Sequence, residues 1–470
     1  MEKLIPQSVK KAMKVDVAVS GTMDKAIELW KDMYENHPPW KGKHAICTHI
    51  PATIAEEMAR LVLTEFSIEV TGGAAGSYLN EQLQRELTNI DLHVEDYCAK
   101  GGIVLKPYVS MGVDGQPGQI EVEFVSADHF YPTAYNSKKE ITAGIFLEYK
   151  RMGDYLYTRA EYHQFSGTKV TIVNKAFRSK KIISDDESTV SDSLFNEEVS
   201  LSEVEEWAFL SEEPVEINNV DKPLFVYIRV PKSNHIEPSS PLGVSIFSKA
   251  VKLIKMADQQ WDNISWEYIA KEAKIDASAD LFDDTDEHNA AKDPIYARLF
   301  RQYVDMPQTG EQIKVYSPDI RDVSLFNGFN QYLRRIEWTV GFSYGTLSDP
   351  ASVEKTATEI KASQQRSYRT VSRIQQAWED GLRHLAYSMS VLAKLYKLCP
   401  DGVTEVNCNW GDSVLEDTDK EFVRRFQMVG QGLLSKEAFD KWYFGCDDEA
   451  LEDILPKTLE DDDDIPFNLK

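Results

Sequence analysis

Two long helical stretches constrain the fold of this 470-residue chain more than any other feature. They are predicted over residues 241–275 and 353–398. In the first, apolar residues recur at steps of three and four, as on one face of a helix: Ile246, Ala250, Leu253, Ala257, Trp261, Ile264 and Tyr268. A helix of about 30 residues is roughly 45 Å long, and most globular helices are much shorter. We therefore expect an architectural protein that builds something through repeated copies.

The second stretch changes character along its length. Its second half has an apolar stripe, formed by Val371, Ile374, Trp378, Leu382, Leu385, Met389, Leu392 and Tyr396. Its first half is polar and holds the cations Lys361, Arg366, Arg369 and Arg373. One helix is therefore predicted to pass from a solvated, basic region into a packed core.

Between these stretches lie an insertion, a further helix and a loop. Residues 276–320 open with an acidic run and continue through an amphipathic stretch to a short strand at 312–316. A helix is predicted over 321–342 from its apolar spacing. The loop that follows, 343–352, is rich in Ser, Gly and Thr, so we expect it to be mobile, with few fixed hydrogen bonds.

The first 240 residues combine helices with strands, which predicts an α+β fold. After two helices, joined by a predicted turn at 72–76, β-rich runs follow at 103–109, 120–125, 141–149, 155–165 and 170–177. Turn residues separate them, as in an antiparallel meander. The acidic, Ser-rich segment 184–213 is expected to be exposed, and 224–230 to be one more strand. The tail from 403 predicts a short strand, helices at 417–429 and 435–443, and a final acidic run.

Composition excludes several functional classes. The chain has 52 basic and 77 acidic residues, a formal charge of -25, whereas a tight, sequence-independent nucleic-acid binder normally has a basic stripe. Its 5 cysteines form no CxxC pair, which favours reduced thiols over disulfides or zinc. No apolar run is long enough to span a bilayer or to act as a secretory signal. We expect synthesis in a cytoplasm and no membrane partner.

Motifs for catalysis are missing from the sequence. It contains no GxxxxGK[ST] phosphate loop, no GxSxG nucleophile elbow and no HExxH pair. The acidic groups at 283–287 and 461–464 lack the alternation and glycine of a calcium loop. We interpret them as solvated surface, with loose ion binding or partner docking as the alternatives. No enzyme activity, cofactor or metal site is predicted.

One cationic helix face is suited to contact a phosphate. Arg366, Arg369 and Arg373 are spaced by three and four residues, so they lie on one side of the helix. They could form salt bridges to carboxylates, within the chain or between subunits. The alternative is transient contact with a passing polyanion.

The ordered motifs resemble those of the portal proteins, or head–tail connectors, of long-tailed bacteriophages. They are Pro238-Ser-Ser-Pro-Leu-Gly-Val-Ser-Ile-Phe247, Gly341-Phe-Ser-Tyr-Gly-Thr-Leu-Ser348 and, most specifically, Lys355-Thr-Ala-Thr-Glu-Ile360. Asp128-His-Phe-Tyr-Pro132 and Trp410-Gly-Asp-Ser413 fit the same pattern. The resemblance covers nearly the whole chain and is weakest at 184–213.

The resemblance implies a ring of subunits, twelve in the virion, around a channel for double-stranded DNA. It implies a wing (1–240), a stem helix (241–275), a clip (276–320), a second stem helix (321–342), a tunnel loop (343–352), a long wing helix with a short strand (353–417) and a crown (418–470). The tunnel-loop residues at the DNA channel would be Ser343, Tyr344, Gly345, Thr346, Leu347, Ser348, Asp349 and Ser352. The basic helix face near the channel would comprise Lys355, Lys361, Arg366, Arg369 and Arg373.

The resemblance also implies partners and a location. The clip would face the terminase large subunit during packaging, and head-completion or adaptor proteins afterwards, through Asp283, Asp284, Asp286, Glu287, Arg298 and Arg301. Major capsid and scaffolding proteins would surround a ring at the portal vertex of the virion, assembled in the bacterial cytoplasm. DNA would pass without sequence-specific contacts. Two other hypotheses stay open: a capsid or tail scaffold that never touches DNA, and an enzyme whose site has no recognisable motif.

Overall fold

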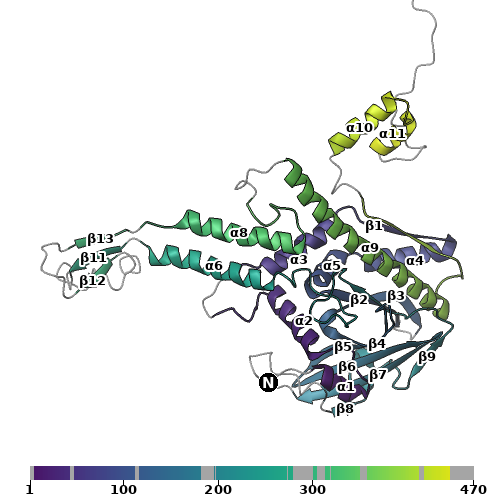
Figure 1. The fold of residues 1–470 in the computed structure, drawn as a ribbon. Coiled ribbons are helices and arrows are strands. Elements are labelled where there is room, and N and C mark those ends of the chain that lie inside the picture. The colour runs from purple at the N-terminus through teal and green to yellow at the C-terminus, as the bar shows by residue number, and fades with distance from the viewer. Residues whose placement is uncertain are drawn as a thin grey trace, which may run out of the picture. The chain divides into compact units, whose positions relative to one another are not determined.

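The computed structural model describes residues 5–42, 47–111, 116–180, 195, 197–272, 274–278, 300–303, 313–317, 319–349, 357–411 and 418–444. The chain divides into two compact units, Met1–Trp410 and Gly411–Lys470. Helices and strands lie mostly in separate stretches of the chain, so the fold is α+β as predicted. Figure 1 shows the elements with the labels used below.

The helices of the first unit are α1 (Ile5–Met13), α2 (Gly21–Tyr34), α3 (Ile50–Leu63), α4 (Gly73–Glu86), α5 (Ile90–Lys100), α6 (Val251–Ala270), α8 (Asp322–Val340) and α9 (Ala357–Tyr396). The second unit contains α10 (Thr418–Gly430) and α11 (Lys436–Phe444). Aromatic ring contacts join these last two helices: the centre of the Phe422 ring lies 5.5 Å from that of Phe439 and 5.3 Å from that of Tyr443.

The predicted meander is divided between two antiparallel sheets. The first has the order β10-β2-β3, formed by Val226–Arg229, Gly102–Met111 and Pro117–Ser126. The second has the order β4-β5-β6-β7-β8, with β9 also paired to β7, formed by Phe130–Tyr135, Ile141–Met152, Tyr155–Ser166, Lys169–Lys180, Glu197–Val199 and Val215–Asn218. The short helix η1 (Ala127–His129) joins β3 to β4.

A large core lies between these sheets and the helices. The apolar stripe of α9 is buried as predicted from Val371 to Leu392, with Trp378 fully inaccessible, whereas Tyr396 at its end is exposed. Trp378 meets the ring of Tyr97 from α5 edge-on at 5.4 Å. The second half of α9 is thus one wall of the core, over β2 and β10.

Segment 184–213 is not simply exposed. Residues 181–194 and 196 lie outside the described residues, but η3 (Leu201–Glu203) and η4 (Glu205–Trp207) follow β8. Leu201, Val204 and Trp207 are buried and pack against Tyr157 and Ala176 of the second sheet. Three apolar side chains among many acids were enough to attach this segment, because the hydrophobic effect depends on buried area rather than on average composition.

The first long helix begins later than the sequence predicts. Residues 241–250 are not helical, and α6 covers 20 residues, which is about 30 Å rather than 45 Å. Gly243 explains part of this difference, because a Cβ there would lie 2.0 Å from the carbonyl oxygen of Gly101. The amide of Ile246 also donates to the carbonyl of Cys98 at 3.0 Å. This segment packs along the core instead of coiling.

The segment 72–76 was predicted to be a turn between two helices, and this prediction is wrong. A short strand precedes it, β1 (Ser67–Thr71), and Gly73 already begins α4. β1 pairs antiparallel with β14 (Glu405–Asn409), more than 300 residues later in the chain. Neither strand has a neighbouring hairpin partner, so local sequence patterns gave no indication of the pairing.

α6 and α8 form an antiparallel hairpin that projects from the rest of the first unit (Figure 1). The Trp261 ring packs against Phe329, with ring centres 5.1 Å apart, and against Phe326 at 6.2 Å. At the far end of α6, Glu267 accepts hydrogen bonds from Arg321 at 2.8 and 3.1 Å and contacts Lys271 at 2.7 Å. These contacts hold the two helices in one register.

A small sheet lies between α6 and α8 in the chain. It has the order β12-β11-β13, with β11 at Lys274–Ser278, β12 at Phe300–Tyr303 and β13 at Ile313–Tyr316. β11 runs parallel to β12 and antiparallel to β13. The sequence predicted only the last of these strands, at 312–316.

A buried carboxylate, Asp128 in η1, joins α2 and α5 to the sheets. It accepts hydrogen bonds from Ser126 Oγ at 2.5 Å and Lys100 Nζ at 3.1 Å, and Lys31 Nζ lies 3.3 Å away. Burial alone would raise the pKa of Asp128, but Lys100 and its other polar neighbours hold that pKa well below the usual value. The ionised group is therefore part of the folded state.

We predict that Asp128→Asn lowers the free energy of unfolding by about 3 kcal/mol at pH 7, because it leaves buried cations short of a partner. The folded-state pKa lies below the unfolded value of about 3.9. The stabilisation is therefore complete well above pH 4 and disappears as pH falls through the folded-state pKa. Urea unfolding at several pH values measures the difference. Asp154→Asn, in an exposed turn, is the control; equal effects of both substitutions would contradict the prediction.

Candidate functional site

The predicted loop at 343–352 begins where α8 is capped by a glycine. Gly341 has a φ of 109°, a left-handed conformation that commonly ends helices. The amides of Gly341 and Phe342 both donate to the carbonyl of Glu337, at 2.9 and 3.0 Å. Phe342 is then buried in the core, so the chain reverses direction against the end of α8.

The side chain of Glu337 organises this loop. It is completely buried. Its Oε1 accepts hydrogen bonds from the backbone amides of Gly345 (3.2 Å), Leu347 (2.6 Å) and Ser348 (2.7 Å), and its Oε2 accepts one from Ser348 Oγ (2.9 Å). Hydrogen bonds to an ionised acceptor are stronger than neutral ones. One carboxylate therefore fixes four donors of the loop.

This arrangement corrects the expectation of a loop with few fixed hydrogen bonds. Ser343 and Thr346 also contact each other, because Thr346 Oγ1 donates to the Ser343 carbonyl at 2.8 Å. The amide of Asp349 donates to Asn330 Oδ1 of α8 at 3.0 Å. Residues 343–349 are thus attached to α8, whereas Ser352 and Lys355 lie outside the described residues.

α9 is joined to the end of α8 through Trp338. The guanidinium carbon of Arg366 lies 3.8 Å from the centre of the Trp338 ring, and Arg366 Nη2 donates to the Trp338 carbonyl at 2.6 Å. The Tyr344 ring stacks on the same indole at 6.3 Å. A cation over an indole face is attracted by the negative face of the ring. Arg366 is therefore fixed in position.

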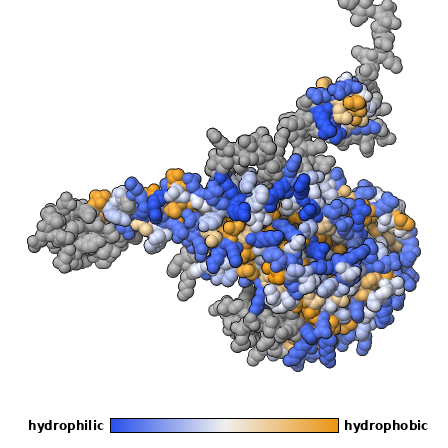
Figure 2. Space-filling model, in the orientation of Figure 1, coloured by the Kyte–Doolittle hydropathy of each residue, from blue (hydrophilic) through white to orange (hydrophobic). Residues whose placement is uncertain are grey.

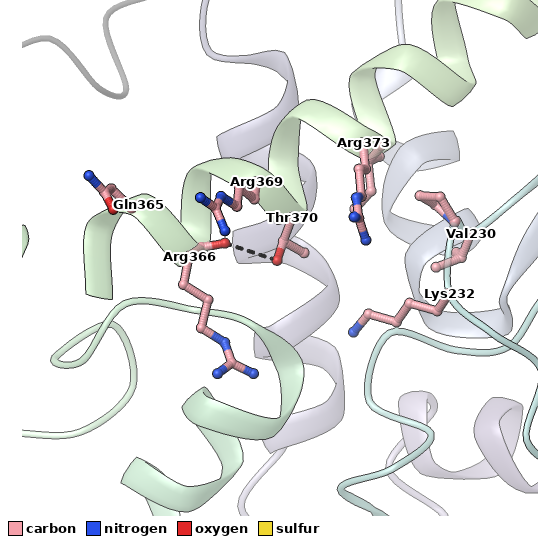
Figure 3. Close-up of a pocket in the computed structure, with 9 residues that line it drawn as sticks. Val230, Lys232, Gln365, Arg366, Arg369, Thr370 and Arg373 are labelled. Atoms are coloured by element: carbon pink, nitrogen blue, oxygen red, sulfur yellow. Dashed lines mark hydrogen bonds between the residues drawn. The ribbon is translucent and has the colours of Figure 1, made fainter. Parts of the chain in front are cut away.

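A basic pocket opens beside this contact (Figure 3). Its volume is about 280 Å³, and it lies between α9 and the segment that follows β10. No acid is found among the described residues that line it: Val230, Pro231, Lys232, Gln365, Arg366, Arg369, Thr370, Arg373 and Ile374. Figure 3 shows Lys232 and Arg373 approaching each other from opposite walls. The geometry is that of a site for an anion.

Lys232 is the recessed cation of the pocket. Its Nζ donates to the carbonyls of Ile246 and Val340, both at 2.8 Å. Burial, together with the nearby cations Lys249 and Arg366, lowers the pKa of Lys232 to about 8. An anion in the pocket would favour the charged form.

Arg369 and Arg373 are exposed at the mouth of the pocket. Within the part of the chain that the structure describes, no carboxylate forms an ion pair with either of them. Of the two sequence-based alternatives, intrachain salt bridging is thus not seen there. Contacts with another subunit or with a polyanion stay predictions.

The remaining predicted site residues are only partly described. Lys361 lies in α9. Arg301 lies on β12, in register with Asp276 of β11. The other predicted clip residues lie outside the described residues: Asp283, Asp284, Asp286, Glu287 and Arg298.

Sequence reasoning missed Glu337 and Lys232. A signal for Glu337 exists, since it lies four residues after Leu333 and three before Val340, on the apolar face of α8. An acid on such a face requires buried donors. The sequence around Lys232 gives no comparable indication of its role. Its neighbours come from three separate segments, which contain Ile246, Val340 and the arginines of α9.

The described residues contain neither a metal-binding group nor a membrane-spanning helix. Among the described residues, no group of His, Cys, Asp and Glu side chains is arranged to bind a metal ion. None of the described helices combines the length and the apolar character that a bilayer crossing requires.

Comparison with known protein families gives a match over most of the chain. The sequence model of the family described as "Phage portal protein, SPP1 Gp6-like" matches residues 25–463 of this chain. The match runs from within α2 to beyond α11 and includes the loop and the basic pocket. No curated protein sequence matches the chain.

We predict that Glu337→Ala speeds hydrogen exchange at the amides of Gly345, Leu347 and Ser348 by at least about tenfold. Each lost hydrogen bond to a charged acceptor is worth about 1.5–3 kcal/mol, and tenfold corresponds to about 1.4 kcal/mol. Glu337→Gln, which keeps an acceptor, should have a smaller effect. Exchange followed by mass spectrometry measures both variants. Asp322→Ala, at the other end of α8, is the control; protection that survives in Glu337→Ala would show that other contacts hold the loop.

Proposed function

Because the chain belongs to the phage portal protein family, SPP1 Gp6-like, we propose that it forms a ring at one vertex of a phage capsid. Double-stranded DNA enters the head through this ring during packaging and leaves through it during ejection. The observation that supports the proposal most is the family match over residues 25–463. The family is structural rather than catalytic, in agreement with the lack of catalytic motifs in the sequence.

The hairpin of α6 and α8 supports self-association. Figure 2 shows hydrophobic residues at the surface along this hairpin. Trp266, Ile269 and Val323 are 67%, 62% and 69% exposed, respectively. Large apolar side chains gathered on a projecting element are typical of an interface. In the ring, neighbouring copies bury them against one another.

The parts of the chain take distinct roles in this proposal. The region 1–240 and α9 form the wing, α6 and α8 line the channel as stem helices, and the loop at 343–352 is the tunnel loop next to DNA. The clip, 276–320, contains the sheet of β11, β12 and β13 and docks the terminase motor, then head-completion or adaptor proteins. The unit that contains α10 and α11 is the crown.

The negative net charge of the chain is compatible with a channel through which DNA slides. Each copy has a formal charge of -25, so a ring of copies is strongly acidic. Such a wall repels the duplex and lets it slide, whereas many phosphate contacts to Lys and Arg would hold it. With a Debye length of about 8 Å at physiological salt, only wall groups near the duplex act on it. DNA is therefore a partner without sequence-specific contacts, and capsid and scaffolding proteins surround the ring.

The first test is imaging of the purified chain by negative-stain electron microscopy. We predict rings with an open axial hole wide enough for a DNA duplex. A capsid or tail scaffold would not form such rings. A chain that remains monomeric under every solution condition, and is missing from the vertex of mature particles, would contradict the proposal.

The second test removes apolar surface from the hairpin. We predict that Trp266→Ser combined with Val323→Ser shifts ring assembly to at least about tenfold higher protein concentration, because each large side chain contributes about 1.5–3 kcal/mol when buried. Sedimentation velocity measures the shift, and the melting temperature should stay unchanged because both residues are exposed. Phe209→Ser, 61% exposed on a loop after η4, is the matched control. Equal behaviour of all these proteins would exclude the hairpin from the interface.

A further inference from the structure

Lysine and arginine side chains of this acidic protein generally form ion pairs with a carboxylate of the same chain. Lys106 Nζ lies 2.6 Å from Glu161, Arg159 lies 2.7 Å from Glu148, and Arg178 lies 2.9 Å from Glu197. With 77 acidic against 52 basic residues, such partners are plentiful. A group of cations without them is therefore unusual for this protein.

The basic pocket is such a group. Lys232, Arg366, Arg369 and Arg373 line one cavity of about 280 Å³, and within the described part of the chain no acidic residue lines it. Arg366 is held over Trp338 and cannot turn away without losing its hydrogen bond to the Trp338 carbonyl. Like charges confined at short distance repel one another, and an anion between them removes that repulsion. The cations of the pocket therefore favour the binding of an anion.

The shape of the pocket favours a protruding side chain over a DNA backbone. Lys232 is recessed between α9 and the segment after β10, and two carbonyls already hold its Nζ (Figure 3). A duplex is a convex cylinder, so its phosphates would reach Arg369 and Arg373 at the mouth rather than Lys232. A carboxylate on a flexible stem can enter and accept bidentate hydrogen bonds from a guanidinium.

We propose that the basic pocket receives an Asp or Glu side chain of a neighbouring copy of this chain. The inference rests on the ring of the proposed function, in which acidic copies lie side by side. The ion pair offsets part of the repulsion between copies that each have a charge of -25, and it fixes the register of one copy on the next.

Charge reversal provides the first arm of the test. We expect Arg369→Glu to raise the protein concentration needed for ring assembly by at least about tenfold in sedimentation velocity. The control is Arg383→Glu on the same helix, where the arginine is exposed and pairs within the chain with Glu379 at 2.7 Å; rings should form as in the wild type. Unchanged assembly of Arg369→Glu, with reduced DNA packaging or retention, would overturn the proposal in favour of a phosphate contact.

Cross-linking identifies the partner carboxylate. Rings assembled from equal amounts of ¹⁴N- and ¹⁵N-labelled Arg369→Lys protein are treated with a carbodiimide, which joins an amine to a carboxylate in direct contact. We expect peptides that link the introduced lysine of one label to an Asp or Glu of the other label. Absence of mixed-label peptides overturns the proposal. A wild-type chain that forms no rings in the same experiment is a separate result, and it overturns the proposed function first.

Discussion

The junction between α8 and α9 depends on the buried carboxylate of Glu337. Its four hydrogen bonds fold residues 345–348 back against α8. The adjacent Trp338 ring then contacts both the Tyr344 ring and the guanidinium of Arg366. The position of Arg366 in turn defines one wall of the basic pocket. An apolar residue at 337 would leave several backbone donors of the loop without partners, so the loop, the aromatic stack and the pocket follow from one polar group.

Local periodicity was a good guide where an element packs through one face. The apolar stripe of α9 is buried as predicted except for Tyr396 at its end. α8 and the long strands lie within a few residues of their expected bounds. The same reasoning failed where tertiary contacts override local preference. Residues 241–250 have helical apolar spacing, yet the close approach of Gly243 to Gly101 requires a non-helical path. β1 was missed because its partner, β14, is remote in the sequence.

The candidate site was predictable in part for a related reason. Arg366, Arg369 and Arg373 share a helix face, and spacing alone identifies such a face. Lys232 becomes their neighbour only through the packing of the segment after β10 against α9, which no local pattern encodes. The expectation of a mobile loop came from its Ser, Gly and Thr content. Composition does not reveal that a single acid, on a different element, binds its amides. The family match supports the role of the chain but assigns no role to these residues.

The length of α9 has a mechanical consequence. Its 40 residues span about 60 Å. The helix passes the basic pocket and continues to the apolar cluster that Leu392 shares with Val170 and Ile217 of the second sheet. A continuous helix resists bending, so a displacement near Arg366 tilts the whole rod about its tightly packed middle at Trp378. The helix then acts as a lever: a force applied beside the basic pocket is transmitted to the second sheet as strain, without any change in secondary structure.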